Sequence, residues 1–114
     1  MFMHGNKDPL VHIDGGPVLR DRGVAISLAQ AAASWRKLDG TSAQLAVENL
    51  PEQAHDGTSA RREIYTGGKQ GTEEGGGHTW PGGPQYLPAF LIGKASHNLD
   101  ATQTIWDFFK RHTR

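Results

Sequence analysis

Large apolar side chains are scarce in this chain, and their scarcity limits the size of any core that it can build. Among 114 residues there are nine Leu, five Ile, four Val and four Phe, whereas Ala contributes twelve and Gly fifteen. Glycine at nearly twice its average frequency of about 7% favours turns and close backbone contacts over long regular elements. The length is that of one domain or of a piece of one. We therefore expect a single small unit with a thin core.

The charge balance and the missing residue types exclude several classes of protein. Twelve Lys and Arg residues cancel twelve Asp and Glu residues, and basic residues cluster no further than the pairs Arg61-Arg62 and Lys110-Arg111. Proteins that bind nucleic acid or anionic membranes have strongly basic surfaces, so we expect neither partner. The absence of cysteine excludes disulfides, a thiolate nucleophile and a cysteine-based zinc site. Residues 1–10 show neither a signal peptide nor a membrane span.

The first residues predict the end of a buried strand. Met1 to Met3 are apolar and lead into a polar turn at Asn6-Lys7-Asp8-Pro9. A central strand needs neighbours on both sides to pair its backbone groups, so this start is typical of a truncated domain.

Two segments have the apolar spacing of amphipathic helices. Apolar residues at i, i+3, i+4 and i+7 from Leu28 predict a helix over 27–39, with Ser27 as its N-cap and Gly40 as its C-terminal stop. A final helix is expected from about Asp100 to His112, capped by Asn98 or by Asp100 itself. The residues expected on or beside its buried side are Ile105, Phe108, Phe109 and Trp106.

The remaining segments are short strands and loops. Residues 41–57 predict a loop with room for one short strand, residues 61–65 alternate as a strand, and residues 66–71 predict a turn. A long loop rich in Pro and Gly is expected over 79–98, and its length favours a functional role. The residues expected to anchor this loop are Leu87, Phe90, Leu91 and Ile92.

Two segments carry residue types that suit acid and base chemistry. Asp8 lies in the segment 4–11, and His78 follows three glycines in the segment 75–83. A catalytic triad needs a carboxylate that sets the imidazole tautomer and a histidine that takes a proton from a hydroxyl. In α/β-hydrolases the order along the chain is nucleophile, acid, histidine, so a nucleophile would precede residue 1.

These strings carry a resemblance to a known family. The Gly-Gly-Gly-His-Thr-Trp-Pro-Gly-Gly string at 75–83, the Ile-Trp-Asp-Phe-Phe string at 105–109 and the His-Gly to Asp-Pro opening at 4–9 resemble the polyhydroxybutyrate depolymerase and feruloyl esterase family. The resemblance implies that residues 1–114 are the C-terminal part of a single α/β-hydrolase domain. The expected structure is an α/β fragment with an incomplete sheet, two helices and the long Gly/Pro-rich loop.

The same resemblance implies a function and its residues. Asp8 would be the triad acid, His78 the triad base, and Trp80 would help to wall an acyl or aryl pocket. The substrate would be a polyester or an aryl ester, no cofactor or metal would be needed, and the family's setting suggests an extracellular protein.

The chain departs from the family pattern at two points. No G-x-S-x-G motif is present, so the nucleophile and the oxyanion hole that accompanies it are absent from these 114 residues. Between the turn at 66–71 and the glycines only Thr72 to Glu74 remain, where similar proteins have an apolar strand, so whether His78 reaches Asp8 stays open. We expect this chain alone to show no appreciable esterase activity.

Several of these residues are also compatible with other roles. The remaining histidines make no ligand spacing, so a metal site is not expected. The glycines at 75–77 precede no Lys-Ser/Thr pair and suit close backbone passage rather than phosphate binding. Asp8 could be a turn residue alone. The rival function is a non-enzymatic remnant or an interaction module, which pairs with another chain through an exposed sheet edge.

Overall fold

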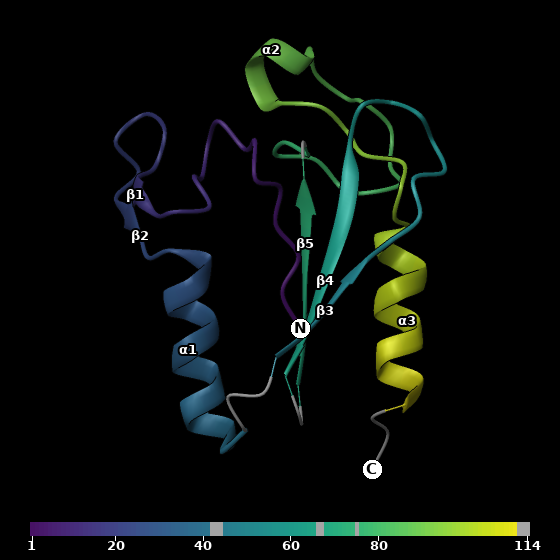
Figure 1. The fold of residues 1–114 in the computed structure, drawn as a ribbon. Helices are drawn as coiled ribbons and strands as arrows, with labels where there is room; N and C mark the ends of the chain where they lie inside the picture. The colour runs from purple at the N-terminus through teal and green to yellow at the C-terminus, as the bar shows by residue number, and fades with distance from the viewer. Residues whose placement is uncertain (42–44, 66–67, 75, 112–114) are drawn as a thin grey trace.

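A computed structural model of the chain describes residues 1–41, 45–65, 68–74 and 76–111. Within those residues it contains a two-stranded sheet, a three-stranded sheet and three helices, which is a mixed α/β arrangement (Figure 1). The narrower prediction of an α/β-hydrolase fragment stays a prediction, because the sheets described are antiparallel and carry no parallel strand pair.

A small hairpin leads into the first helix. Strand β1 (Gly16–Pro17) pairs antiparallel with β2 (Val24–Ala25), and α1 spans Leu28–Asp39. The Oγ atom of Ser27 accepts a hydrogen bond from the Gln30 backbone N–H at 3.1 Å, and the Gln30 side chain accepts one from the Ser27 N–H at 3.0 Å. This capping box satisfies two of the free N–H groups at the helix start. The predicted helix, its N-cap and its stop at Gly40 are confirmed.

The larger sheet has the order β3-β4-β5, with β3 at Leu45–Asn49, β4 at Ser59–Tyr65 and β5 at Gly68–Glu74. Both pairs are antiparallel; Leu45 lies opposite Tyr65, and Tyr65 lies opposite Gly68. The turn predicted over 66–71 is therefore wrong for residues 68–71. Their backbone groups pair with those of β4. This long-range pairing cannot be predicted from the turn-forming residues of the segment itself. Residues 66 and 67 lie outside the described ranges.

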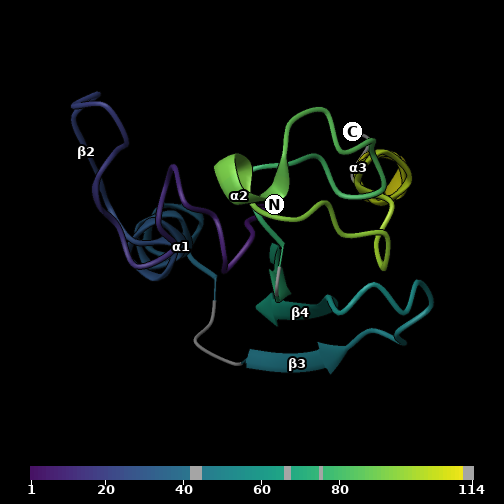
Figure 2. The ribbon, with the colours of Figure 1, turned by 90° about the horizontal axis from the view of Figure 1, so that it is seen from above.

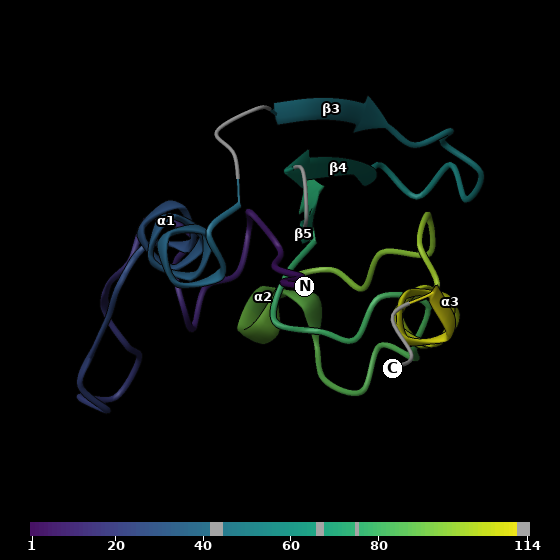
Figure 3. The same cartoon turned by 90° about the horizontal axis from the view of Figure 1, so that it is seen from below.

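The two longer helices lie on opposite sides of the molecule. Helix α3 (Ala101–Arg111) lies far from α1, with the N-terminal segment and β5 between them (Figures 2 and 3). The Asp100 carboxylate accepts a hydrogen bond from the Gln103 N–H at 2.9 Å, so Asp100 caps α3 and Asn98 does not. His112 lies outside the described residues. None of the helices in the described part is long and apolar enough to cross a membrane.

The core is small, as predicted. The buried apolar residues among those described are Ala32, Ala60, Ile92, Ala95 and Ala101. Of the residues expected to anchor the 79–98 loop, which contains the short helix α2 (Ala89–Ile92), only Ile92 is buried, and Phe90 is 84% exposed. The expected burial of Phe109 is also wrong, and Trp35 and Trp106 are exposed as well. No described helix packs closely against the three-stranded sheet, so more than half of the surface of each of these three side chains stays open to solvent.

The expected strand at the N-terminus is not observed. Residues 1–4 have no regular secondary structure, and the Met1 side chain is exposed. An apolar run forms a strand only where a neighbour pairs with its backbone, and no described strand pairs with this one.

Candidate active site

Asp8 and His78, 70 residues apart in the sequence, are in direct contact. The Nδ1 atom of His78 lies 2.8 Å from Oδ2 of Asp8. A carboxylate can only accept, so the geometry fits a His78 ring that carries its proton on Nδ1 and donates it to Asp8. The short interval before the glycines does not keep His78 away from Asp8, because β5 begins at Gly68 and carries the chain to the histidine loop.

The Asp8 carboxylate is held by its own turn. Its Oδ1 atom accepts hydrogen bonds from the backbone N–H groups of Leu10 at 2.8 Å and Val11 at 3.0 Å. Asp8 is buried, with 6% of its surface exposed. The turn role and the contact with His78 therefore coexist: one oxygen stabilises the turn, and the other faces the imidazole.

Glycines bring the histidine loop close to its neighbours. The Lys7 N–H donates to the Gly76 carbonyl at 2.9 Å, which ties the Asp8 turn to the loop that carries His78. The Gly77 N–H donates to the Lys94 carbonyl at 2.8 Å, and a Cβ atom at Gly77 would overlap the backbone of Ile92 and Gly93. The predicted close backbone passage is thus confirmed at Gly77, while Gly75 lies outside the described residues.

An open pocket of about 460 Å³ lies beside the Asp8–His78 pair. Its apolar lining includes Met3, Val11 and Trp80, and Tyr86 also contributes. The residue predicted to wall a pocket, Trp80, lines this cavity and a neighbouring one of about 200 Å³. The Trp80 indole N–H donates to the Thr102 hydroxyl at 3.1 Å, which anchors the ring to the start of α3.

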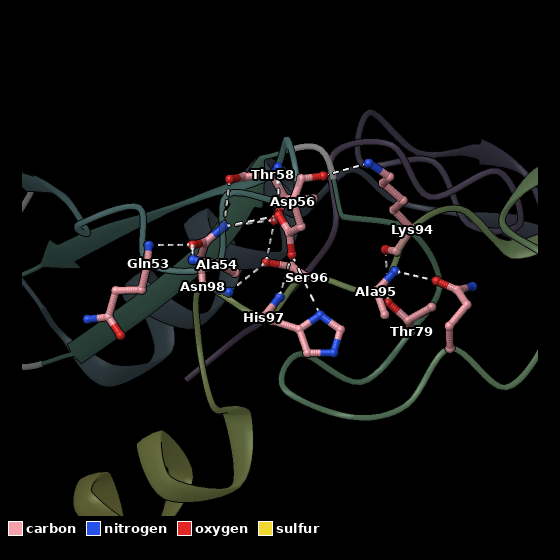
Figure 4. A network of polar contacts seen from close by, with 11 residues as sticks. Gln53, Ala54, Asp56, Thr58, Thr79, Lys94, Ala95, Ser96, His97 and Asn98 are labelled. Carbon is pink, nitrogen blue, oxygen red and sulfur yellow. Dashed lines mark hydrogen bonds and ion pairs between the residues drawn. The ribbon is translucent and has the colours of Figure 1, made fainter.

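A polar network around Asp56 joins two loops that are distant in the sequence (Figure 4). The Asp56 carboxylate accepts hydrogen bonds from the Thr58 hydroxyl at 2.6 Å, the Thr58 N–H at 2.9 Å and the His97 N–H at 3.0 Å. These bonds, the Thr58 hydroxyl first, lower the pKa of Asp56 from 3.8 to about 2. The Asn98 side chain adds a bond to the Thr58 carbonyl at 2.6 Å. The network pins residues 94–98 against residues 53–58.

This network reaches the histidine loop through Lys94. The Lys94 ammonium donates to the Asp56 carbonyl, and the Lys94 carbonyl accepts from the Gly77 N–H at 2.8 Å and the Thr79 hydroxyl at 3.2 Å. Both neighbours of His78 in the sequence are therefore bound to one carbonyl. Sequence reasoning missed this support, because its members lie about 40 residues apart and follow no motif.

In the described residues the Asp8–His78 pair has no hydroxyl nucleophile bonded to it. No serine or threonine hydroxyl in the described ranges is hydrogen-bonded to the His78 ring, whose only hydrogen bond there is to Asp8. The described residues contain no group of three or more His, Asp or Glu side chains that could hold a metal ion. The arrangement can accept and return a proton.

A comparison with known proteins gives one informative match. The chain is 31% identical over 124 aligned positions to "Putative esterase NocK" of Nocardia uniformis subsp. tsuyamanensis. The match covers 95% of this chain but only 36% of that protein's length. The chain is therefore similar to part of an esterase-like protein. No protein-family model matches the sequence, and no solved structure matches it.

Proposed function

We propose that Asp8 and His78 are the acid and the base of a serine-esterase triad that hydrolyses carboxylic esters. The observation that carries the proposal is the 2.8 Å contact between His78 Nδ1 and Asp8 Oδ2, beside an open pocket. The similarity to an esterase-like protein supports the reaction class. The nucleophilic serine is supplied from outside these 114 residues.

The proposed chemistry follows from the two ring nitrogens of His78. Nδ1–H stays on Asp8, so Nε2 is free to take the proton of the serine hydroxyl as its oxygen attacks the ester carbonyl. The protonated ring then gives that proton to the departing alcohol, which leaves an acyl-enzyme. Water hydrolyses the acyl-enzyme by the same proton transfers. Asp8, held by Leu10 and Val11, keeps the ring in the productive tautomer.

The finer part of the proposal is that the ester is a polyester or an aryl ester. The apolar side chains of Met3, Val11 and Trp80 around the pocket support a substrate with an apolar acyl or aryl group. The exposed indole of Trp80 suits contact with such a group.

The proposal can be tested in a chimera. The part of NocK that matches this chain is replaced by residues 1–114, and hydrolysis of a p-nitrophenyl ester is measured. We expect His78→Ala to lower kcat by about 10⁶-fold and Asp8→Asn by about 10⁴-fold, because the triad members act together. His97→Ala is the matched control, since His97 contacts Asp56 and lies outside the pocket lining. Equal activity of the chimera and its His78→Ala variant would refute the proposal.

A labelling experiment compares the chimera with the 114-residue chain on its own. A fluorophosphonate probe should label the active chimera and leave the 114-residue chain unlabelled, because the chain has no G-x-S-x-G serine. A covalent adduct on the isolated chain would place the nucleophile within it, contrary to the proposal.

A second candidate is a non-enzymatic remnant or an interaction module that associates with another chain. Two observations favour it. Large apolar side chains such as Phe90, Val24 and Leu38 are exposed, whereas the buried core of the described residues is mostly alanine. In addition, β3 and β5 are both edges of the three-stranded sheet. Exposed edges and apolar patches are surfaces through which chains associate.

A further inference from the structure

Tyr86 contacts the histidine loop at His78 itself. Its phenolic hydroxyl donates a hydrogen bond to the backbone carbonyl of His78 at 2.8 Å, and its ring lines the 460 Å³ pocket. No motif in the sequence singled out this tyrosine. Its bond goes to the main chain of the proposed base, so it acts on the position of His78 without occupying either ring nitrogen.

The segment that carries Tyr86 is clamped at its base by Gln85. The Gln85 amide donates to the carbonyls of Leu87 at 2.7 Å and Gly93 at 3.0 Å, and its oxygen accepts from the Ala95 N–H at 2.7 Å. Gln85 therefore ties together the two ends of the loop that contains α2, and it fixes the backbone next to Tyr86. A tyrosine on a clamped loop can hold a neighbour in place at a low cost in conformational entropy.

The His78 peptide needs such a hold because its local sequence provides little. Gly77 precedes it and places no side-chain restriction on the backbone. The His78 N–H donates to the Ile92 carbonyl at 2.5 Å, and the Tyr86 hydroxyl binds the His78 carbonyl. The two bonds hold the residue from opposite ends of its main chain, and Asp8 holds the ring.

We propose that Tyr86 is a positioning residue for His78: through the His78 carbonyl it keeps the imidazole on Asp8. The inference rests on the proposed function of His78 and extends it. Tyr86 is 57% exposed and its ring is not needed to fill the core. Loss of the hydroxyl alone should therefore affect the histidine more than the stability of the chain.

The test is Tyr86→Phe in the 114-residue chain, which keeps the ring and removes the hydrogen bond. Imidazole ¹⁵N chemical shifts at alkaline pH report the ratio of the Nδ1–H and Nε2–H tautomers of His78. We expect this ratio to fall by up to about five-fold, because the free energy of one ordinary hydrogen bond limits the shift. Tyr65→Phe is the matched control, because the Tyr65 hydroxyl is 3.4 Å from Glu63 on β4 and has no contact with His78.

Gln85→Ala provides a second variant, since it releases the loop and keeps the phenol. We expect a smaller shift of the tautomer ratio in the same direction. An unchanged ratio in Tyr86→Phe, with thermal unfolding like that of the parent chain, would overturn the inference. A shift caused by Gln85→Ala alone would assign the effect to the loop and also overturn the role of the phenol.

The tautomer measurement is independent of catalysis. In the chimera, a positioning role predicts that Tyr86→Phe lowers kcat several-fold with KM unchanged, whereas a substrate contact would raise KM. Should the chimera prove inactive for other reasons, the tautomer ratio still decides the role of Tyr86. The failure of the proposed function and the failure of this inference are thus distinguishable.

Discussion

At the scale of single residues, two carboxylates with similar surroundings do different work. Each carboxylate accepts two backbone N–H bonds. Those to Asp8 come from Leu10 and Val11, and those to Asp56 come from Thr58 and, across a loop contact, from His97. One Asp8 oxygen contacts the His78 ring, whereas the Asp56 oxygens accept hydrogen bonds from Thr58, His97 and Asn98. The first arrangement holds an imidazole ring, and the second joins two loops.

The ionisation of Asp56 predicts a pH dependence of stability. Its pKa in the folded chain is about 2, below the ordinary 3.8, so the carboxylate stabilises the fold above pH 3.8. That contribution is lost as the pH falls from 3.8 through 2. We expect the unfolding temperature of the parent chain to drop more steeply over this range than that of Asp56→Asn, as followed by circular dichroism.

Asp107→Asn is a suitable control for this measurement. The Lys110 hydrogen bond, followed by that of Gln103, also lowers the pKa of Asp107, but the group lies on the surface of α3. Surface ion pairs contribute little to stability, so its effect should be small. Identical pH profiles for the parent chain and Asp56→Asn would show that the ionisation of Asp56 does not stabilise the fold.

How far the sequence predicts the site also depends on single residues. Asp8 and His78 could be singled out because the residue types and the family-like strings mark them, and the structure places them in contact. Tyr86, Gln85 and Lys94 could not, because no motif marks them: Tyr86 and Gln85 bond within the mostly irregular 78–95 segment, and Lys94 bonds to Asp56, 38 residues away. Local patterns carry no record of such contacts.

At the scale of elements, structure that depends on local signals was predictable and structure that depends on pairing was not. Helix α1 has its stop and start signals within its own sequence, from Ser27 to Gly40. Strand β5 contains Gly68 and Gly71 and lacks any apolar alternation, so only its register with β4 reveals it as a strand.

The capping box of α1 predicts a defined cost for its removal. Ser27→Ala deletes the bond to the Gln30 N–H and should lower the free energy of unfolding by about 1 kcal/mol. Urea denaturation followed by circular dichroism measures it. Ser34→Ala, an exposed position within the same helix, is the control and should be neutral or slightly stabilising, because alanine favours helix. Equal losses in the two variants would show that the cap has no special role.

At the scale of the whole molecule, the chain has more apolar surface than it can bury. Among the larger apolar side chains of the described residues only Ile92 is buried, and α1 and α3 lie on opposite sides of the molecule without packing closely on the three-stranded sheet (Figure 2). The sequence predicted a thin core from its few large apolar residues. It could not predict which faces stay uncovered, because coverage depends on what packs against them.

This imbalance predicts association through the edges of the sheet. Strand β3 is an edge strand, and Val47 on it is 55% exposed. A charged side chain on an edge strand prevents pairing with another edge. We expect sedimentation velocity to show a concentration-dependent increase in mass for the parent chain and a several-fold weaker association for Val47→Lys. Val24→Lys, at a more exposed position in the small β1-β2 hairpin and outside the three-stranded sheet, should leave pairing through the β3 edge unchanged. A parent chain that stays monomeric at every concentration would exclude edge pairing, and with it the interaction-module alternative in its homotypic form.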